Sequence, residues 1–229
     1  MSARIGRRIG WFAVLTCVVA LAATAPDAAA QARPAPRPAG DPAIRVRGFF
    51  EAGARTFTAS KSVEAVLGSS SGGIFGAGGE VLFGRNLFVS IGVSRFQRDG
   101  ERVVVFEDEA FPLGIATTVK VVPIELSAGW RFTNPRRSVI PYVGGGVGWH
   151  KYQETSEFSD AGEDSEFTKT GFQLLGGAEW RAARWLGIAG EAAWMSVPDA
   201  FTEPSSAAVA FDEDNLGGAV FRIKVVIGR

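Results

Sequence analysis

Histidine, the residue type that most often changes its charge near neutral pH, occurs once in this chain, as His150. A catalytic role would require a nucleophile and an acid at a fitting spacing, and a metal site would require several further ligands. No Ser/His/acid arrangement with a convincing spacing occurs around Trp149–Tyr152 or elsewhere. We therefore predict no catalytic residue, no metal-binding residue and no cofactor, with an enzyme as the disfavoured alternative.

The single cysteine offers no site chemistry either. Cys17 lies in the apolar run Ile9–Ala25, which follows a basic segment and precedes the small residues Ala28–Ala30. This order is typical of a cleaved signal peptide, which we place at residues 1–30; a retained anchor or a lipoprotein is the alternative. Without Cys17 the mature chain can form neither a disulfide framework nor a cysteine metal site.

Charged residues recur at every second position in several segments, for example Glu179 and Arg181, or Arg222 and Lys224. A period of two places such residues on one face of a strand. In a narrow interior they would have to pair, because an isolated buried charge loses its hydration without compensation. The predicted ion-pair network has the acids Glu51, Glu80, Glu125, Glu179 and Glu191 and the bases Arg47, Arg131, Arg181, Arg222 and Lys224.

The elements that position these charges are strands, since the apolar period from Ile44 onward is two rather than 3.6. The expected strands are Ile44–Thr58, Gly73–Gly84, Asn86–Arg98, Thr118–Phe132, Val139–Tyr152, Thr168–Arg181, Trp185–Val197 and Leu216–Arg229. Short connections alternate with the long ones, Ala59–Gly72, Asp99–Thr117, Gln153–Phe167 and Pro198–Asn215. This pattern predicts an all-β fold, an eight-stranded antiparallel up-and-down transmembrane β-barrel.

A soluble barrel or sandwich would also show many short strands, so the two faces decide between the alternatives. The face opposite the charges is uniformly apolar, as at Val122, Ile124 and Leu126. It ends in aromatic residues near both strand ends, which we predict to form the interfacial girdles of a membrane protein. These residues are Trp130, Phe132, Trp149, Trp180 and Trp194. The glycine-rich charged face is too sparse for a solvated surface, which favours an apolar face toward lipid.

Ile140–Tyr152 carries four glycines within one expected strand. Glycine weakens an ordinary strand, so it needs a reason here. On the inward face, Gly144, Gly146 and Gly148 would leave room for long Glu and Arg side chains, because an eight-stranded barrel is only wide enough to be filled by side chains. A glycine hinge that bends the strand is the alternative explanation.

The segments Val121–Phe132, Pro141–Tyr152 and Gly171–Met195 together resemble the small outer-membrane β-barrel family, of the type of the outer membrane protein A membrane domain and outer membrane protein W. The resemblance covers residues 44–229. It implies termini in the periplasm, insertion by the barrel-assembly machinery, and no common catalytic activity. Residues 31–43, rich in Pro and Ala, would then form a linker between signal peptide and barrel.

The long loops are acidic, most of all Glu154–Phe167, whereas the short turns are basic. A solvated loop surface explains this, and weak divalent-cation binding that bridges to lipopolysaccharide is the functional alternative. Equal totals of Lys+Arg and Asp+Glu, 24 each, give no basic footprint for nucleic acid. We predict a protein of the outer membrane with a largely plugged lumen and a structural or interaction role. The alternative is a narrow channel or transporter for small or hydrophobic solutes.

Overall fold

The structure is a computed structural model that describes residues 44–106, 109–134, 136–156, 165–201 and 207–228. The expected signal peptide and linker lie outside the described residues. The elements are β1 (Ile44–Phe57), α2 (Ser60–Leu67), β2 (Ser71–Phe83), β3 (Leu87–Phe106), β4 (Glu109–Arg131), β5 (Val139–Ser156), β6 (Ser165–Arg181), β7 (Leu186–Ser196), α3 (Ala207–Ala210) and β8 (Gly218–Gly228).

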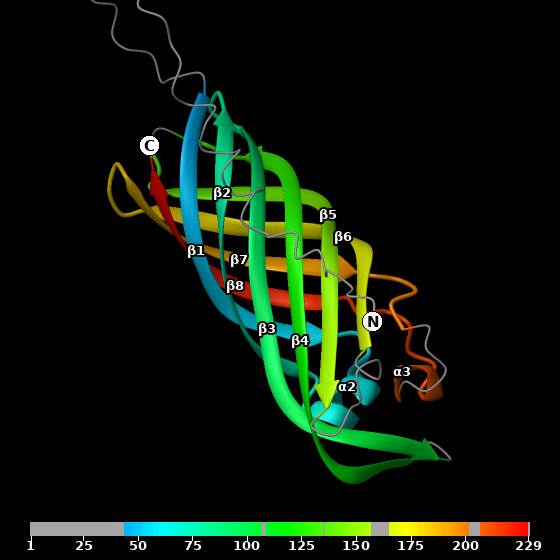
Figure 1. Cartoon of the computed structure of the whole chain (residues 1–229). Helices are drawn as coiled ribbons and strands as arrows, with labels where there is room; N and C mark the ends of the chain where they lie inside the picture. The colour runs from blue at the N-terminus through cyan, green and yellow to red at the C-terminus, as the bar shows by residue number, and fades with distance from the viewer. Residues whose placement is uncertain (1–43, 107–108, 135, 157–164, 202–206, 229) are drawn as a thin grey trace, which may run out of the picture. The chain divides into compact units, whose positions relative to one another are not determined.

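The eight strands form a closed antiparallel ring in chain order (Figure 1). Each strand pairs with the next, and β1 closes the ring by pairing with β8 from Arg47↔Gly228 to Phe57↔Gly218. Closure leaves no exposed strand edge around the ring, which satisfies the backbone groups without solvent. The predicted eight-stranded up-and-down β-barrel is confirmed. Neither described helix has the length and apolar run needed to span a bilayer.

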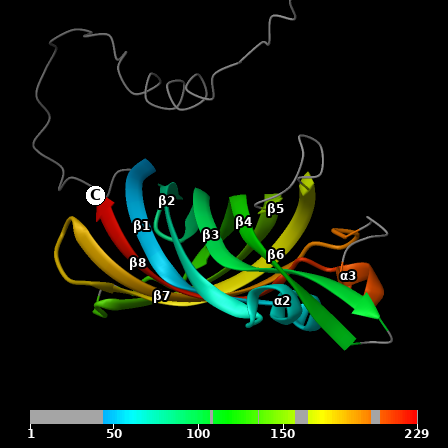
Figure 2. The same cartoon turned by 60° about the horizontal axis from the view of Figure 1, so that its bottom comes forward.

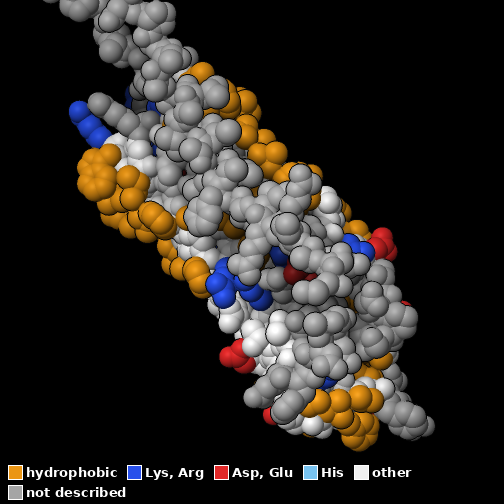
Figure 3. Space-filling model, in the orientation of Figure 1, with side chains coloured by type: hydrophobic (Ala, Val, Ile, Leu, Met, Phe, Trp, Pro, Cys, Tyr) orange, Lys and Arg blue, Asp and Glu red, His pale blue; other side chains and the backbone are white. Residues whose placement is uncertain are grey.

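Side chains alternate between lumen and exterior along every strand. In β5, Val143 is 50% exposed whereas its neighbour Tyr142 is 6% exposed; in β6, Leu174 is 65% exposed and Gln173 3%. The exterior therefore carries the apolar residues, as the space-filling view shows at several places along the barrel (Figure 3). A water-soluble barrel would have the opposite arrangement, so the faces lie as the sequence analysis expected.

The predicted girdle residues all point outward. Their exposed fractions lie between 43% and 53%, and the residues are Trp130, Phe132, Trp149, Trp180 and Trp194. Trp185, which is 58% exposed beside the β6–β7 turn, belongs with them. The sequence analysis left it out because it was assigned only as the start of a strand.

The glycines on the inward face are explained mainly by close neighbouring backbone and aromatic rings, and not by room for long Glu and Arg side chains, which was the first expectation. A Cβ at Gly146 would clash with the backbone oxygen of Leu126 on β4, and a Cβ at Gly129 would lie 2.6 Å from the Phe88 ring. At these two positions the backbone of the next strand and an aromatic ring, rather than long charged side chains, therefore occupy the space. At Gly148 the expected reason holds in part, because a Cβ there would lie 3.0 Å from His150 Nε2 and 3.6 Å from Glu125 Cγ. The alternative of a glycine bend, which lets β4 and β5 approach closely inside a tightly curved barrel, is the better explanation.

Two predicted loops are wrong in part. Asp99–Thr117 was expected to be a loop, but β3 and β4 continue as a hairpin whose pairs run from Asp99↔Thr118 to Phe106↔Glu109, with an irregularity between Glu101 and Val103. The β-branched run Val103–Val105 supports this extension, because such residues pair well across strands. The loop Gln153–Phe167 is likewise shortened at both ends by β5 and β6.

The other two long connections contain helices that were not expected. α2 lies within the predicted loop Ala59–Gly72, and α3 lies within Pro198–Asn215. The two helices lie at the long-loop end of the barrel (Figures 1 and 2). Val63, Val66 and Leu67, spaced three and four residues apart, are the sequence signal for α2.

Candidate functional site

The inward face holds two groups of charged side chains. The first, here called the turn-end cluster, consists of Arg47, Glu80, Arg131 and Glu179. Arg47 donates to both oxygens of Glu179 at 2.8 and 2.9 Å and also binds Glu80. Arg131 donates to Glu179 at 2.7 Å and forms an ion pair with Glu80 at 3.7 Å. Two acids and two bases thus balance within one cluster, whose members are buried apart from the partly exposed Glu80.

The second group, the central cluster, consists of Glu51, Glu125, Glu191, Arg222 and Lys224. Arg222 is its hub: its Nε donates to Glu191 at 2.7 Å, and its Nη1 donates to Glu125 at 2.9 Å and to Glu51 at 3.3 Å. Lys224 donates to the other oxygen of Glu191 at 2.7 Å. Because all these side chains are buried, the contacts compensate charges that water cannot reach.

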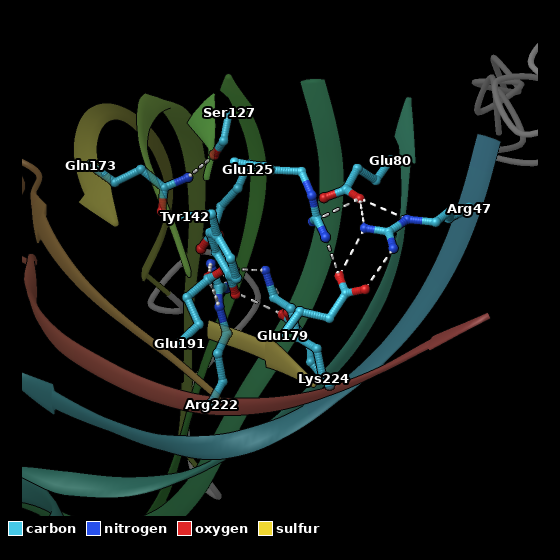
Figure 4. A network of polar contacts seen from close by, with 12 residues as sticks. Arg47, Glu80, Glu125, Ser127, Tyr142, Gln173, Glu179, Glu191, Arg222 and Lys224 are labelled. Atoms are coloured by element: carbon cyan, nitrogen blue, oxygen red, sulfur yellow. Dashed lines mark hydrogen bonds and ion pairs between the residues drawn. The ribbon is translucent and has the colours of Figure 1, made fainter. Parts of the chain in front are cut away.

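Tyr142 lies between the two clusters, as the close-up of the network shows (Figure 4). Its hydroxyl donates to Glu191 at 3.0 Å, and the Arg131 guanidinium lies 5.9 Å from the centre of its ring. The aromatic ring therefore contacts the turn-end cluster through a cation–π interaction and the central cluster through a hydrogen bond. The two clusters form one continuous polar layer.

Some of these contacts join adjacent strands and others cross the lumen. Glu191 and Arg222 are direct register partners on β7 and β8. In contrast, Arg222 on β8 reaches Glu125 on β4, which lies on the opposite side of the ring. Glu179 on β6 likewise reaches Arg47 on β1. Such links are available only after the barrel has closed.

Two arginines differ from the expected network. Arg181, a predicted base, is exposed at the end of β6, and among the described residues it forms no ion pair with the network acids. It is the last residue of β6, so the strand ends at this position. Arg55, which was not predicted, is 2% exposed and donates to the Leu216 backbone oxygen at 2.9 Å. With Arg55 counted, five buried bases lie near the five predicted acids; the other four are Arg47, Arg131, Arg222 and Lys224.

A small cavity of about 10 Å³ lies inside the central cluster, lined among others by Glu51, Glu125, Ser127 and Lys224. The Glu51 Oε2 and Glu125 Oε1 atoms are buried there without a hydrogen-bond donor. A cavity of this size holds on the order of one water molecule.

A group of buried apolar side chains lies at the long-loop end of the barrel interior. Leu67 of α2, Phe96 of β3 and Leu216 before β8 are buried in one hydrophobic cluster with Tyr152. The carboxylate of Glu213 holds α2 in place, because it accepts from the Ser62 backbone N–H at 2.8 Å and from its hydroxyl at 2.7 Å. Sequence analysis treated Glu213 as one of several loop acids and missed this capping role.

His150 lies inside the barrel at 2% exposure, and its Nδ1 atom has no hydrogen-bond partner among the described residues. The described residues also contain no group of three or more His, Cys, Asp or Glu side chains fit to hold a metal ion. That the chain has no enzymatic or metal site stays a prediction.

The acidic loops are described only in part, since residues 107–108 and 157–164 lie outside the described residues. At their base, Lys151 binds Glu166 at 2.6 Å. This bond, with a second from Gln153, holds the pKa of the exposed Glu166 carboxyl below its usual value. Glu166 and Glu213, two acids of the predicted loops that the structure describes, thus already have partners within the chain.

Solved structures of other outer-membrane barrels align with this chain. Neisserial surface protein A aligns with a TM-score of 0.51 and 13% identity, over 82% of this chain and 97% of that one. A major outer membrane protein from Thermus thermophilus aligns with a TM-score of 0.48 and 13% identity, over 82% and 100%. The N-terminal β-barrel domain of Pseudomonas aeruginosa OprF aligns with 0.46 and 10%, over 80% and 97%. No protein-family model and no curated protein matches the chain.

Proposed function

We propose that this chain, which has the fold of the small eight-stranded outer-membrane β-barrels, is an outer-membrane protein with a closed lumen. Its role is then structural, or one of interaction through the loops at its long-loop end. The observation that carries the proposal is the inverted distribution of side chains, with apolar residues outside and a paired charged layer inside.

The exterior supports the membrane location. Leu174, Ile223 and Phe221 are 61–65% exposed, which would be costly for so many apolar side chains on a protein in water. Flanking aromatic residues such as Trp180 and Trp194 suit the two interfaces of a bilayer. Outer-membrane lipid, including lipopolysaccharide, is then the main partner, and the barrel-assembly machinery would insert the chain.

The orientation follows from the lengths of the connections. In outer-membrane barrels the short turns face the periplasm and the long loops face the exterior. The start of β1 and the end of β8 lie at the short-turn end, so both ends of the barrel domain would be periplasmic. The partly described acidic loops would be displayed outside, where weak divalent cations could bridge them to anionic lipid.

Two layers support the closed lumen: the polar layer of the turn-end and central clusters, and the buried apolar side chains around Leu67 and Leu216. Charged groups paired across the lumen leave little room for a continuous column of water. The test is conductance of the refolded chain in a planar lipid bilayer. Wild-type protein should show no large steady conductance, and the triple variant E51Q/E125Q/E191Q should conduct measurably.

The triple variant removes three acids but keeps their size, so the unpaired bases should draw water into the lumen. E166Q, which removes an acid outside the lumen, is the control and should behave as wild type. Large steady conductance of the wild-type barrel would contradict the closed lumen. It would support instead a narrow channel for small or hydrophobic solutes.

A further inference from the structure

The three short turns carry a concentration of arginine. The turns at residues 84–86, 132–138 and 182–185 contain Arg85, Arg136, Arg137 and Arg184, all exposed, and no Asp or Glu. Among the described residues, the acids nearest to this end, Glu80 and Glu179, point into the lumen and contact Arg47 and Arg131. The rim at the short-turn end is therefore positively charged, and we call these four residues the arginine rim.

The arginine rim adjoins the outward aromatic residues. Trp180 pairs with Val139 and Trp130 pairs with Leu87, and each is the next-to-last residue of its strand before a turn. Trp185 directly follows Arg184 and is 58% exposed. Basic and hydrophobic side chains lie next to each other where β6 and β7 meet (Figure 3). Tryptophan marks the level of the lipid headgroups, so the arginines lie at that level too.

We propose that the arginine rim binds the phosphate groups of anionic phospholipids in the leaflet at the short-turn end. The inference rests on the proposed membrane location. A planar guanidinium can donate two parallel hydrogen bonds to a phosphate, and basic residues beside a membrane attract anionic lipid. The surface is continuous with the lipid-facing exterior, which favours a lipid headgroup over an anionic polymer of the cell wall, since the latter would lie beyond the aromatic level.

The experiment measures which lipids remain bound to the barrel. The refolded chain is placed in nanodiscs that contain phosphatidylcholine and phosphatidylglycerol, released, and analysed by native mass spectrometry for the ratio of bound lipids. Wild type should be enriched in phosphatidylglycerol. R85Q/R136Q/R137Q/R184Q should lose that enrichment by about tenfold or more, since each arginine near the surface contributes on the order of a fivefold change in affinity. High salt should weaken the enrichment of wild type.

The matched control compares two charges at each end of the barrel. R136Q/R137Q changes the arginine rim, whereas K61Q/R102Q removes the same charge from α2 and the β3–β4 hairpin at the other end. R136Q/R137Q should lower the enrichment and K61Q/R102Q should keep it. Equal ratios for the two variants would overturn the proposal. Binding of soluble peptidoglycan fragments without phosphatidylglycerol enrichment would also overturn it, in favour of a cell-wall partner.

A flotation assay separates this inference from the proposed function. Chain that fails to float with phosphatidylcholine vesicles contradicts the membrane location, and with it the inference. Chain that floats but shows no preference for phosphatidylglycerol contradicts the arginine rim alone. Flotation with the preference, lost only in the rim variants, supports both.

Discussion

Replacement of Glu179 by Gln should destabilise the barrel more than any exposed Glu→Gln change. Glu179 is 2% exposed and accepts three hydrogen bonds from two arginines, at distances of 2.7 to 2.9 Å. Gln has nearly the same size but carries no charge, and its amide nitrogen would face a guanidinium donor. At least one bond is therefore lost, and the turn-end cluster keeps two bases with one acid.

The magnitude follows from the stranded charge. Removal of one partner from a buried ion pair costs about 3–5 kcal/mol, because the other charge stays buried without compensation. Glu80 contacts both Arg47 and Arg131 and can share its charge between them, so we expect the lower end, about 3 kcal/mol. This free energy corresponds to about two orders of magnitude in the unfolding equilibrium.

The assay is reversible urea unfolding of the barrel in lipid vesicles, followed by tryptophan fluorescence. E166Q is the matched control, because Glu166 is exposed and its ion pair with Lys151 is screened by solvent. Its unfolding midpoint should be that of wild type within error. The same small shift for E179Q and E166Q would refute the conclusion that the buried layer is held by paired charges.

A double variant tests the physical reason. R131Q/E179Q removes one base and one acid, so Arg47 and Glu80 remain as a neutral pair. If the cost of E179Q comes from a stranded charge, the double variant should be less destabilised than the sum of its single variants. Additive costs would mean that packing rather than charge dominates at this site.

Two further predictions concern the exterior and the glycines. L174R should lower insertion into vesicles, at a cost of about 2–4 kcal/mol. L113R, an equal change at an exposed residue of the β3–β4 hairpin, should be tolerated. Equal effects of the two variants in a flotation and urea assay would argue against a lipid-facing exterior at Leu174. G146A should destabilise the barrel by about 1–3 kcal/mol, because its Cβ would clash with the β4 backbone. G190A should not destabilise the barrel, because the space at its Cβ is open. Urea midpoints in the reverse order would contradict the close approach of β4 and β5.

The loops show where local sequence signals compete. Val103–Val105 favours a strand, but the sequence analysis placed these residues in the long connection Asp99–Thr117. In the structure the pairing of Val104 with Phe111 extends the hairpin. α2 was missed for a related reason: its eight residues form too short a periodic segment to stand out, and its N-terminus is capped by Glu213, which lies far along the chain. No local pattern contains such a partner.

The sequence by itself determined the number of strands, their antiparallel order and the face of each side chain. A strand has a period of two, so the alternation of Leu174 with Gln173, or of Ile223 with Arg222, separates two faces of the sheet. The aromatic residues near both strand ends then assigned the apolar face to the exterior. The outward aromatic residues Trp130 and Trp180 followed from the same alternation. Pairs on adjacent strands, such as Glu191 with Arg222, were within reach of this reasoning.

Only the tertiary structure decided which charges meet. The contacts of Arg222 with Glu125 and of Arg47 with Glu179 cross the lumen, and they depend on the closure and stagger of the whole ring. The same closure left Arg181 exposed at a strand end and buried Arg55 beneath Leu216. The physical reason is that alternation fixes the direction of a side chain, whereas its partner across the barrel is set by the width of the lumen and the relative height of distant strands.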